Sequence, residues 1–95
     1  MHRTIELKHI GPKEHVRRLL TELIDRLEDK LQHLPEESHS IHVLFEEHGT
    51  RTLCRAALSC HVPGRIVAAH EEGRDPGRTI REAFRALERQ LIKRN

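Results

Sequence analysis

Apolar and polar residues alternate in four segments of the chain, a pattern typical of half-buried β-strands. In one of them Ile41, Val43 and Phe45 fall on the same face. Pro63 and Gly64 lie between the last two segments and suit the central positions of a tight turn. The pattern therefore predicts four strands, the last two joined as a hairpin, at residues 3–10, 40–47, 52–62 and 65–71.

Two further segments repeat apolar residues every three or four positions, as amphipathic helices do. The first helix is predicted over 12–34, where leucines form most of the stripe and Pro35 ends it. For the second, Asp75 is a suitable N-cap and Pro76 a suitable first helical residue. The apolar stripe of this final helix consists of Ile80, Phe84, Leu87 and Leu91.

The predicted order of elements is strand, helix, strand, strand, strand, helix. Three consecutive strands linked by short turns favour an antiparallel meander, whereas the first strand must join through a helical crossover and so favours a parallel neighbour. Each element has one apolar side to bury. We therefore predict an α+β fold, β-α-β-β-β-α, with two helices packed on one face of a four-stranded mixed sheet, in a single domain over 1–95.

Composition narrows the kind of partner. The chain of 95 residues has two Phe and no Tyr or Trp, so it lacks the aromatic platform on which single-stranded nucleic acids stack. The N-terminus does not resemble a signal peptide, and no run approaches a membrane span. Without secretory features, the two cysteines are expected to be reduced thiols. These observations predict a cytoplasmic protein with no membrane partner.

Positive charge is concentrated in the final helix. The formal net charge is only +2, but from Gly73 onward seven Lys and Arg face three Asp and Glu. On a helical wheel the basic side chains lie opposite the apolar stripe, with Glu82 and Glu88 expected at their margins. Arginine suits bidentate contact with phosphate. The candidate phosphate-binding side chains of this segment are Arg74, Arg78, Arg81, Arg85, Arg89 and Lys93.

The first helix is expected to contribute less to such a site. Its outer face tends to be acidic, with Glu22, Asp25 and Asp29, so only the flanks of its apolar stripe offer cations. These flanking cations are Arg17, Arg26 and Lys30. Two interpretations of the basic surface remain open from the pattern alone. It is either an ordinary solvated surface or a phosphate-binding one.

No catalytic or cofactor-binding pattern is present. Neighbouring acidic residues point to opposite faces of a strand, and no phosphate-binding glycine loop occurs. Cys54 and Cys60 are six residues apart, about 20 Å along a strand, so they do not share a metal or a disulfide. We expect no enzyme, cofactor, metal site or small-molecule substrate. Nine histidines are scattered through the chain, and their protonation is expected to strengthen binding to RNA at mildly acidic pH.

Eight positions near the C-terminus carry a family resemblance: Glu72, Gly73, Asp75, Ile80, Leu87, Gln90, Leu91 and Lys93. With the first helix up to Pro35 and the predicted order of elements, they resemble the ribosome hibernation promoting factor family. That family is also known as ribosome-associated inhibitor or sigma-54 modulation proteins. The chain is similar to its short form, and it departs from the usual pattern at Gly77 and in the acidic outer face of the first helix.

The resemblance implies a protein that binds the small ribosomal subunit between head and body. There it would contact ribosomal RNA through basic residues and reversibly block translation. Two alternatives remain open: a module whose basic helix binds an acidic protein partner, and a double-stranded RNA-binding domain. The sheet face left uncovered by the helices also allows a homodimer, with Leu44, Leu53 and Ile66 as candidate contacts.

Overall fold

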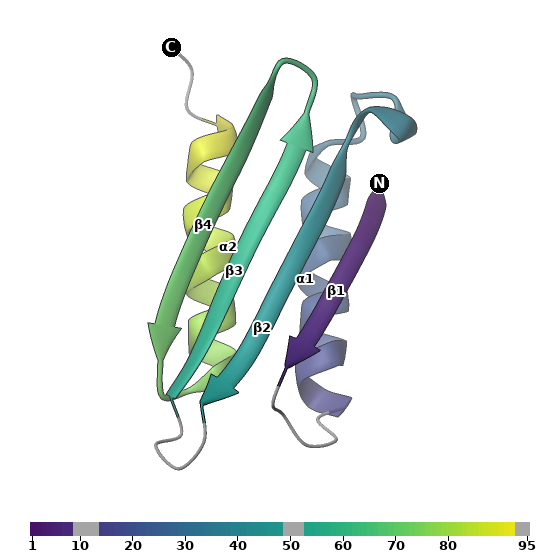
Figure 1. Ribbon diagram of the computed structural model, residues 1–95. Helices are drawn as coiled ribbons and strands as arrows, with labels where there is room; N and C mark the ends of the chain where they lie inside the picture. Colours follow the sequence, from purple (N-terminus) through teal and green to yellow (C-terminus); the bar gives the residue numbers. More distant parts are fainter. Residues whose placement is uncertain (9–13, 49–52, 93–95) are drawn as a thin grey trace.

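The computed structural model describes residues 1–8, 14–48 and 53–92 and confirms the predicted α+β fold (Figure 1). One short 3₁₀ helix, η1, was not predicted. The elements in chain order are β1 (His2–Lys8), α1 (Glu14–Lys30), η1 (Glu36–Ser38), β2 (Ser40–His48), β3 (Leu53–Val62), β4 (Arg65–Gly73) and α2 (Pro76–Ile92).

The four strands form one mixed sheet in the order β1-β2-β3-β4. β1 is parallel to β2, while β2–β3 and β3–β4 are antiparallel, as the helical crossover and the hairpins predict. Both helices lie on the same face of the sheet (Figure 1). Each follows a strand of the same direction and returns along the sheet, so α1 and α2 run parallel to each other. None of the described helices is long and apolar enough to cross a membrane.

The core lies between the sheet and the helices. Its two aromatic residues, Phe45 from β2 and Phe84 from α2, are both almost fully buried. Leucines of α1 and alternate residues of β2 and β3 fill the space around them. Cys54 and Cys60 point into this core as free thiols, and burial raises the pKa of the Cys60 thiol.

The first helix ends four residues earlier than its leucine pattern predicts. Regular helix stops at Lys30, and the amides of Leu31 and Leu34 then donate to carbonyls three residues back. Pro35 disfavours helical backbone at the preceding residue, so the chain leaves the helix through tight turns. Leu31 remains buried all the same. The apolar period continues past the helix because these turns still pack on the core.

Of the predicted turns, the one at Pro63 and Gly64 lies within the described residues. Gly64 has φ +86°, the left-handed conformation that the predicted tight turn requires at its second central residue. The predicted breaks at 11–12 and 48–50 lie wholly or partly outside the described residues, as does the predicted start of α1.

An ion-pair cluster fastens β1 to α1. Arg3 Nη2 lies 2.7 Å from Asp25 Oδ1 and 2.5 Å from Glu28 Oε1. The hydrogen bond from Arg3 holds the pKa of the Glu28 carboxyl below the ordinary value for glutamate. The Glu28 side chain is 31% exposed, so the pair is only partly screened by solvent.

Glu28→Gln is expected to lower the free energy of unfolding near neutral pH by about 0.5–1 kcal/mol. Because the folded pKa is depressed, this stabilisation is present above the unfolded pKa of about 4.3 and disappears as the pH falls through the folded value. Urea unfolding of both proteins from pH 7 to pH 3 measures the difference. Glu22→Gln, on the exposed face of the same helix, is the control. A Glu28→Gln deficit that does not shrink as the pH falls below the unfolded pKa would contradict the assignment.

Candidate nucleic-acid interface

The final helix begins where the sequence predicts. Pro76 is its first residue, and Asp75 caps it: Oδ1 accepts from the amides of Gly77 at 3.1 Å and Arg78 at 3.4 Å. The carbonyl of Asp75 also accepts from the amide of Thr79. This capping satisfies amides that have no partner inside the helix and holds the first arginines of α2 in place.

A close approach just before the cap positions α2 against the sheet. A β-carbon placed on Gly73 would lie 2.6 Å from Oγ1 of Thr79, so only glycine fits here without a shift. Thr79 is buried, and the thiol of Cys54 donates to the carbonyl of Gly73 at 3.2 Å and lies 3.6 Å from Oγ1 of Thr79. The end of β4, the start of β3 and the first turn of α2 therefore meet at this point.

The arginines of α2 lie on its outer surface as predicted. Arg74, Arg78, Arg81, Arg85 and Arg89 are all exposed, while Lys93 lies outside the described residues. Their opposite side, the stripe around Ile80 and Phe84, is buried in the core.

Glu82, predicted at the margin of this row, pairs with one of its members. Its carboxylate is 3.5 Å from Nε of Arg78, one turn away. Within the part of the chain that the structure describes, no ion pair involves Arg81, Arg85 or Arg89. The middle and the C-terminal part of the row therefore carry the unneutralised charge.

Two of the three predicted cations of α1 lie beside α2. Nζ of Lys30 is 2.5 Å from Oε1 of Glu88, so the last turn of α1 is joined to the last turns of α2. Arg26 precedes Lys30 by one helical turn and is exposed on the same side. Glu88 thus lies at the margin as predicted. We call the exposed side chains of Arg26 and Lys30 with Arg78, Arg81, Arg85 and Arg89 the basic face.

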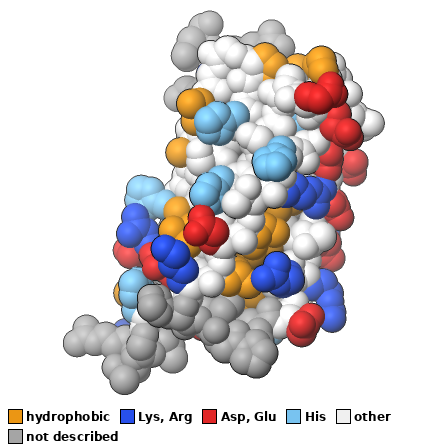
Figure 2. All heavy atoms as spheres, turned by 45° about the vertical axis from the view of Figure 1, so that its right-hand side comes forward, with side chains coloured by type: hydrophobic (Ala, Val, Ile, Leu, Met, Phe, Trp, Pro, Cys, Tyr) orange, Lys and Arg blue, Asp and Glu red, His pale blue; other side chains and the backbone are white. Residues whose placement is uncertain are grey.

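Arg17 is separated from the basic face. Eleven residues separate it from Glu28, which is about three helical turns, so both lie on the same side of α1. Glu28 is bonded to Arg3 of β1, which places that side at the edge of the molecule away from α2. Figure 2 shows a column of acidic side chains along this edge. Arg17 is exposed but does not continue the row of α2.

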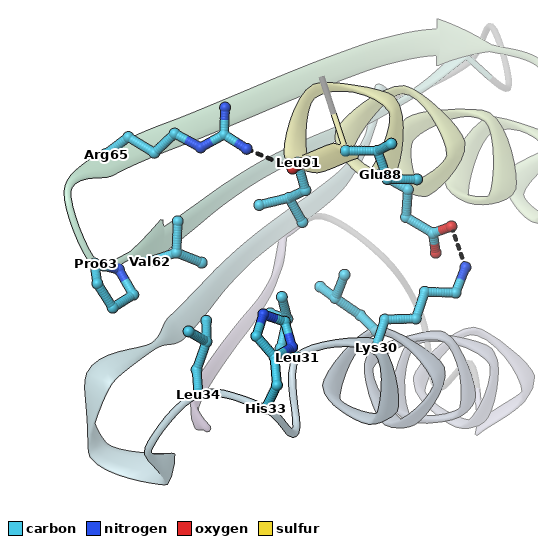
Figure 3. Close-up of a pocket in the computed structure, with 11 residues that line it drawn as sticks. Lys30, Leu31, His33, Leu34, Val62, Pro63, Arg65, Glu88 and Leu91 are labelled. Carbon is cyan, nitrogen blue, oxygen red and sulfur yellow. Dashed lines mark hydrogen bonds and ion pairs between the residues drawn. The ribbon is translucent and has the colours of Figure 1, made fainter. Parts of the chain in front are cut away.

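A groove of about 700 Å³ opens where α1 and α2 end, beside the β3–β4 hairpin (Figure 3). Arg65 of β4 donates through Nη2 to the carbonyl of Leu91, which satisfies an acceptor at the C-terminal end of α2. Lys30 and Glu88 point toward one another across the groove (Figure 3). Sequence reasoning did not assign Arg65 this role, because no local pattern links a strand residue to a helix end.

Most of the described histidines lie away from the basic face. Five alternate with core residues on the opposite face of the sheet: His2, His42, His48, His61 and His70. His39 is buried instead, and its Nδ1 has no hydrogen-bond partner among the described residues. The positive charge that these histidines gain on protonation is therefore far from α2 and largely screened by salt. The expected gain in RNA binding on acidification depends on this long-range effect and stays a prediction. No three His, Cys, Asp or Glu side chains gather for a metal within the described ranges.

The family model described as "Sigma 54 modulation protein / S30EA ribosomal protein" matches residues 4–95. The chain belongs to this family. A comparison with curated proteins finds no match. Two solved structures are similar. A ribosomal subunit interface protein from Coxiella burnetii has 19% identity and a TM-score of 0.74, over 96% of this chain and 93% of that one. The N-terminal domain of Thermus thermophilus Protein Y has 21% identity and a TM-score of 0.74, over 96% of both chains.

Membership agrees with the resemblance seen in the sequence, and the geometry explains several of the residues that carried it. Gly73 admits the side chain of Thr79, and Asp75 caps α2. Gln90 donates from Nε2 to the carbonyl of Ala68 on β4. These positions support the packing of α2 on the sheet. The basic side chains project from that scaffold.

Proposed function

We propose that this protein binds the small ribosomal subunit through contacts between its basic face and phosphate oxygens of ribosomal RNA, and that it thereby reversibly inhibits translation. The observation that carries the proposal is the row of exposed arginines on α2, extended by Arg26 and Lys30 of α1, in a member of this family. Arg74, at the entry to α2, adds to this row. Each side chain acts as a fixed cation and none does chemistry.

The geometry of α2 suits a folded RNA. Arg78, Arg81, Arg85 and Arg89 follow one another at spacings of three and four residues, so they extend over about 16 Å of the helix axis. Guanidinium groups on a rigid helix position a protein on phosphates without reading sequence. The near-absence of aromatic residues points in the same direction, towards recognition of shape and backbone.

Family membership and topology favour ribosome binding over a double-stranded RNA-binding domain and over a module that binds an acidic protein. Double-stranded RNA-binding domains lack an opening strand, whereas β1 here pairs with β2 along its whole described length. An acidic protein partner also fits a basic helix, and it becomes one outcome of the binding experiment. A homodimer through the uncovered sheet face is a separate proposal, because it uses none of the cations of the basic face.

Co-sedimentation of the purified protein with isolated small subunits is the direct test, performed over a salt series. If the four arginines of α2 each neutralise one phosphate, the logarithm of the affinity falls with the logarithm of salt with a slope of about −3. Affinity then drops about 60-fold between 50 and 200 mM salt. Absence of co-sedimentation even at the lowest salt would refute ribosome binding. A flat salt response would refute the phosphate contacts.

A further inference from the structure

The sheet face opposite the helices is not covered by any described element (Figure 1). Figure 2 shows part of this side, with histidines spread among small and polar side chains. Its apolar members are few: Ile66 is 63% exposed, and Leu44 and Leu53 are half-buried. We call this surface the open sheet face. The distinctive feature of this face is the arrangement of its charged side chains and not its apolar area.

One cross-strand row of this face alternates in charge. Lys8 of β1 is in register with Glu46 of β2, Glu46 with Arg55 of β3, and Arg55 with Glu72 of β4. All four side chains point to the open side, and Lys8, Arg55 and Glu72 are exposed. Glu46 is less exposed and lies 4.0 Å from Nε2 of His48. We call these four residues the charge row. Within one sheet, neighbouring opposite charges already stabilise each other modestly.

The charge row, read from β4 to β1, has at each position the charge opposite to that of the row read from β1 to β4. Consider a two-fold axis that runs parallel to the strands, above the open sheet face and over the gap between β2 and β3. It places a second sheet face to face with the first and reverses the order of the strands in the second sheet. Lys8 then meets Glu72 of the second copy, and Glu46 meets Arg55. All four contacts across the interface join opposite charges. We propose that the open sheet face is the docking surface for a second copy of this chain, related by this axis.

The other rows tolerate the same arrangement. In the next row Leu44 and Ala57 lie on either side of the axis, so they stack on Ala57 and Leu44 of the second copy and give the interface an apolar centre. At the ends of that row Glu6 faces His70. Reversing the order brings no two like charges together among the described residues of the face.

The size of the face sets the strength of the dimer. All four strands pair side by side over the seven residues of β1. With strands about 4.8 Å apart, this part of the sheet gives a plane of roughly 450 Å² per copy. A stable complex typically buries about 800 Å² on each partner. The dimer is therefore weak and forms only at high protein concentration. A polyanion is a poorer occupant than a second copy, because Glu46 and Glu72 would repel its phosphates.

Sedimentation velocity over a protein concentration series up to the millimolar range tests the proposal. The wild type is expected to shift from monomer to dimer. Arg55→Glu places glutamate against Glu46 at two symmetric positions and is expected to weaken association by about tenfold or more. Arg18→Glu, the same change at an exposed site of α1, is the matched control and should dimerise like the wild type. Thermal unfolding verifies that each variant is folded.

Charge exchange makes the test specific to the axis. Glu46→Arg alone places arginine against Arg55 and is expected to be monomeric. An equimolar mixture of Glu46→Arg and Arg55→Glu restores four opposite contacts and should form a heterodimer. The double variant, Glu46→Arg with Arg55→Glu, should dimerise by itself. A monomeric wild type, or a mixture that stays monomeric, would overturn the proposal. Binding of Arg55→Glu to ribosomes is expected to be unchanged, so the two proposals fail independently.

Discussion

Replacing Arg81 and Arg85 together by glutamate is expected to abolish co-sedimentation with small ribosomal subunits. Both side chains are exposed at the middle of the basic face, and neither has an ion-pair partner in the described ranges. The change removes two charge-assisted contacts to phosphate and puts repulsive charges in their place. At about 1.5–3 kcal/mol for each contact, affinity falls by at least about 100-fold.

The fold is expected to survive this double replacement, because the buried stripe of α2 is unchanged. Arg18→Glu combined with Arg55→Glu is the matched control. It changes the net charge by the same amount, on the outer face of α1 and on the open sheet face. If the control loses binding to the same degree, the effect comes from net charge and not from a site. Unchanged co-sedimentation of the α2 variant at low salt would refute the basic face as the contact surface.

Gly73→Ala is expected to lower the free energy of unfolding by about 1–3 kcal/mol. The new methyl group would lie 2.6 Å from Oγ1 of Thr79, a buried side chain that has little room to move. The strain falls where α2 leaves the sheet, so the first turn of the helix must shift or the hydroxyl must rotate away from Cys54. Urea unfolding at neutral pH measures the loss.

Two further variants separate this contact from a general effect of alanine. Thr79→Ala removes the clashing oxygen, so the double variant with Gly73→Ala is expected to be no less stable than Thr79→Ala alone. Gly77→Ala is the glycine control: its methyl group would lie 3.1 Å from a guanidinium nitrogen of Arg81, the far end of a flexible side chain, and alanine favours helix. If the costs of Gly73→Ala and Thr79→Ala simply add, the close approach is not the cause.

The helical segments show where pattern is informative and where it stops. Every residue of α2 predicted to face the core does so or packs against it, because a period near 3.6 fixes which side chains share a side. In α1 the same apolar spacing continues beyond the last helical residue, because the turns after Lys30 still pack leucines on the core. Periodicity reports burial, and only hydrogen bonding distinguishes a helix from a turn that packs in the same way.

The sequence also determined only part of the candidate site. The sequence alone determined that α2 has a basic outer side, because spacing within one helix sets the relative direction of its side chains. It did not determine which cations of α1 join them. Lys30 and Arg26 border α2, whereas Arg17 lies at the far edge beside Glu28, and this depends on how the helices pack side by side.

Taken by itself, the sequence determined the order of the elements, the buried side of each and the family resemblance. These are local properties that spacing and turn chemistry encode. The tertiary structure alone decided that Glu82 pairs with Arg78, that Gly73 must leave room for Thr79, and that four charges from four strands align in one row. Each of these depends on strand register or on side-chain packing. Such distances join atoms far apart in the chain, and no local pattern specifies them.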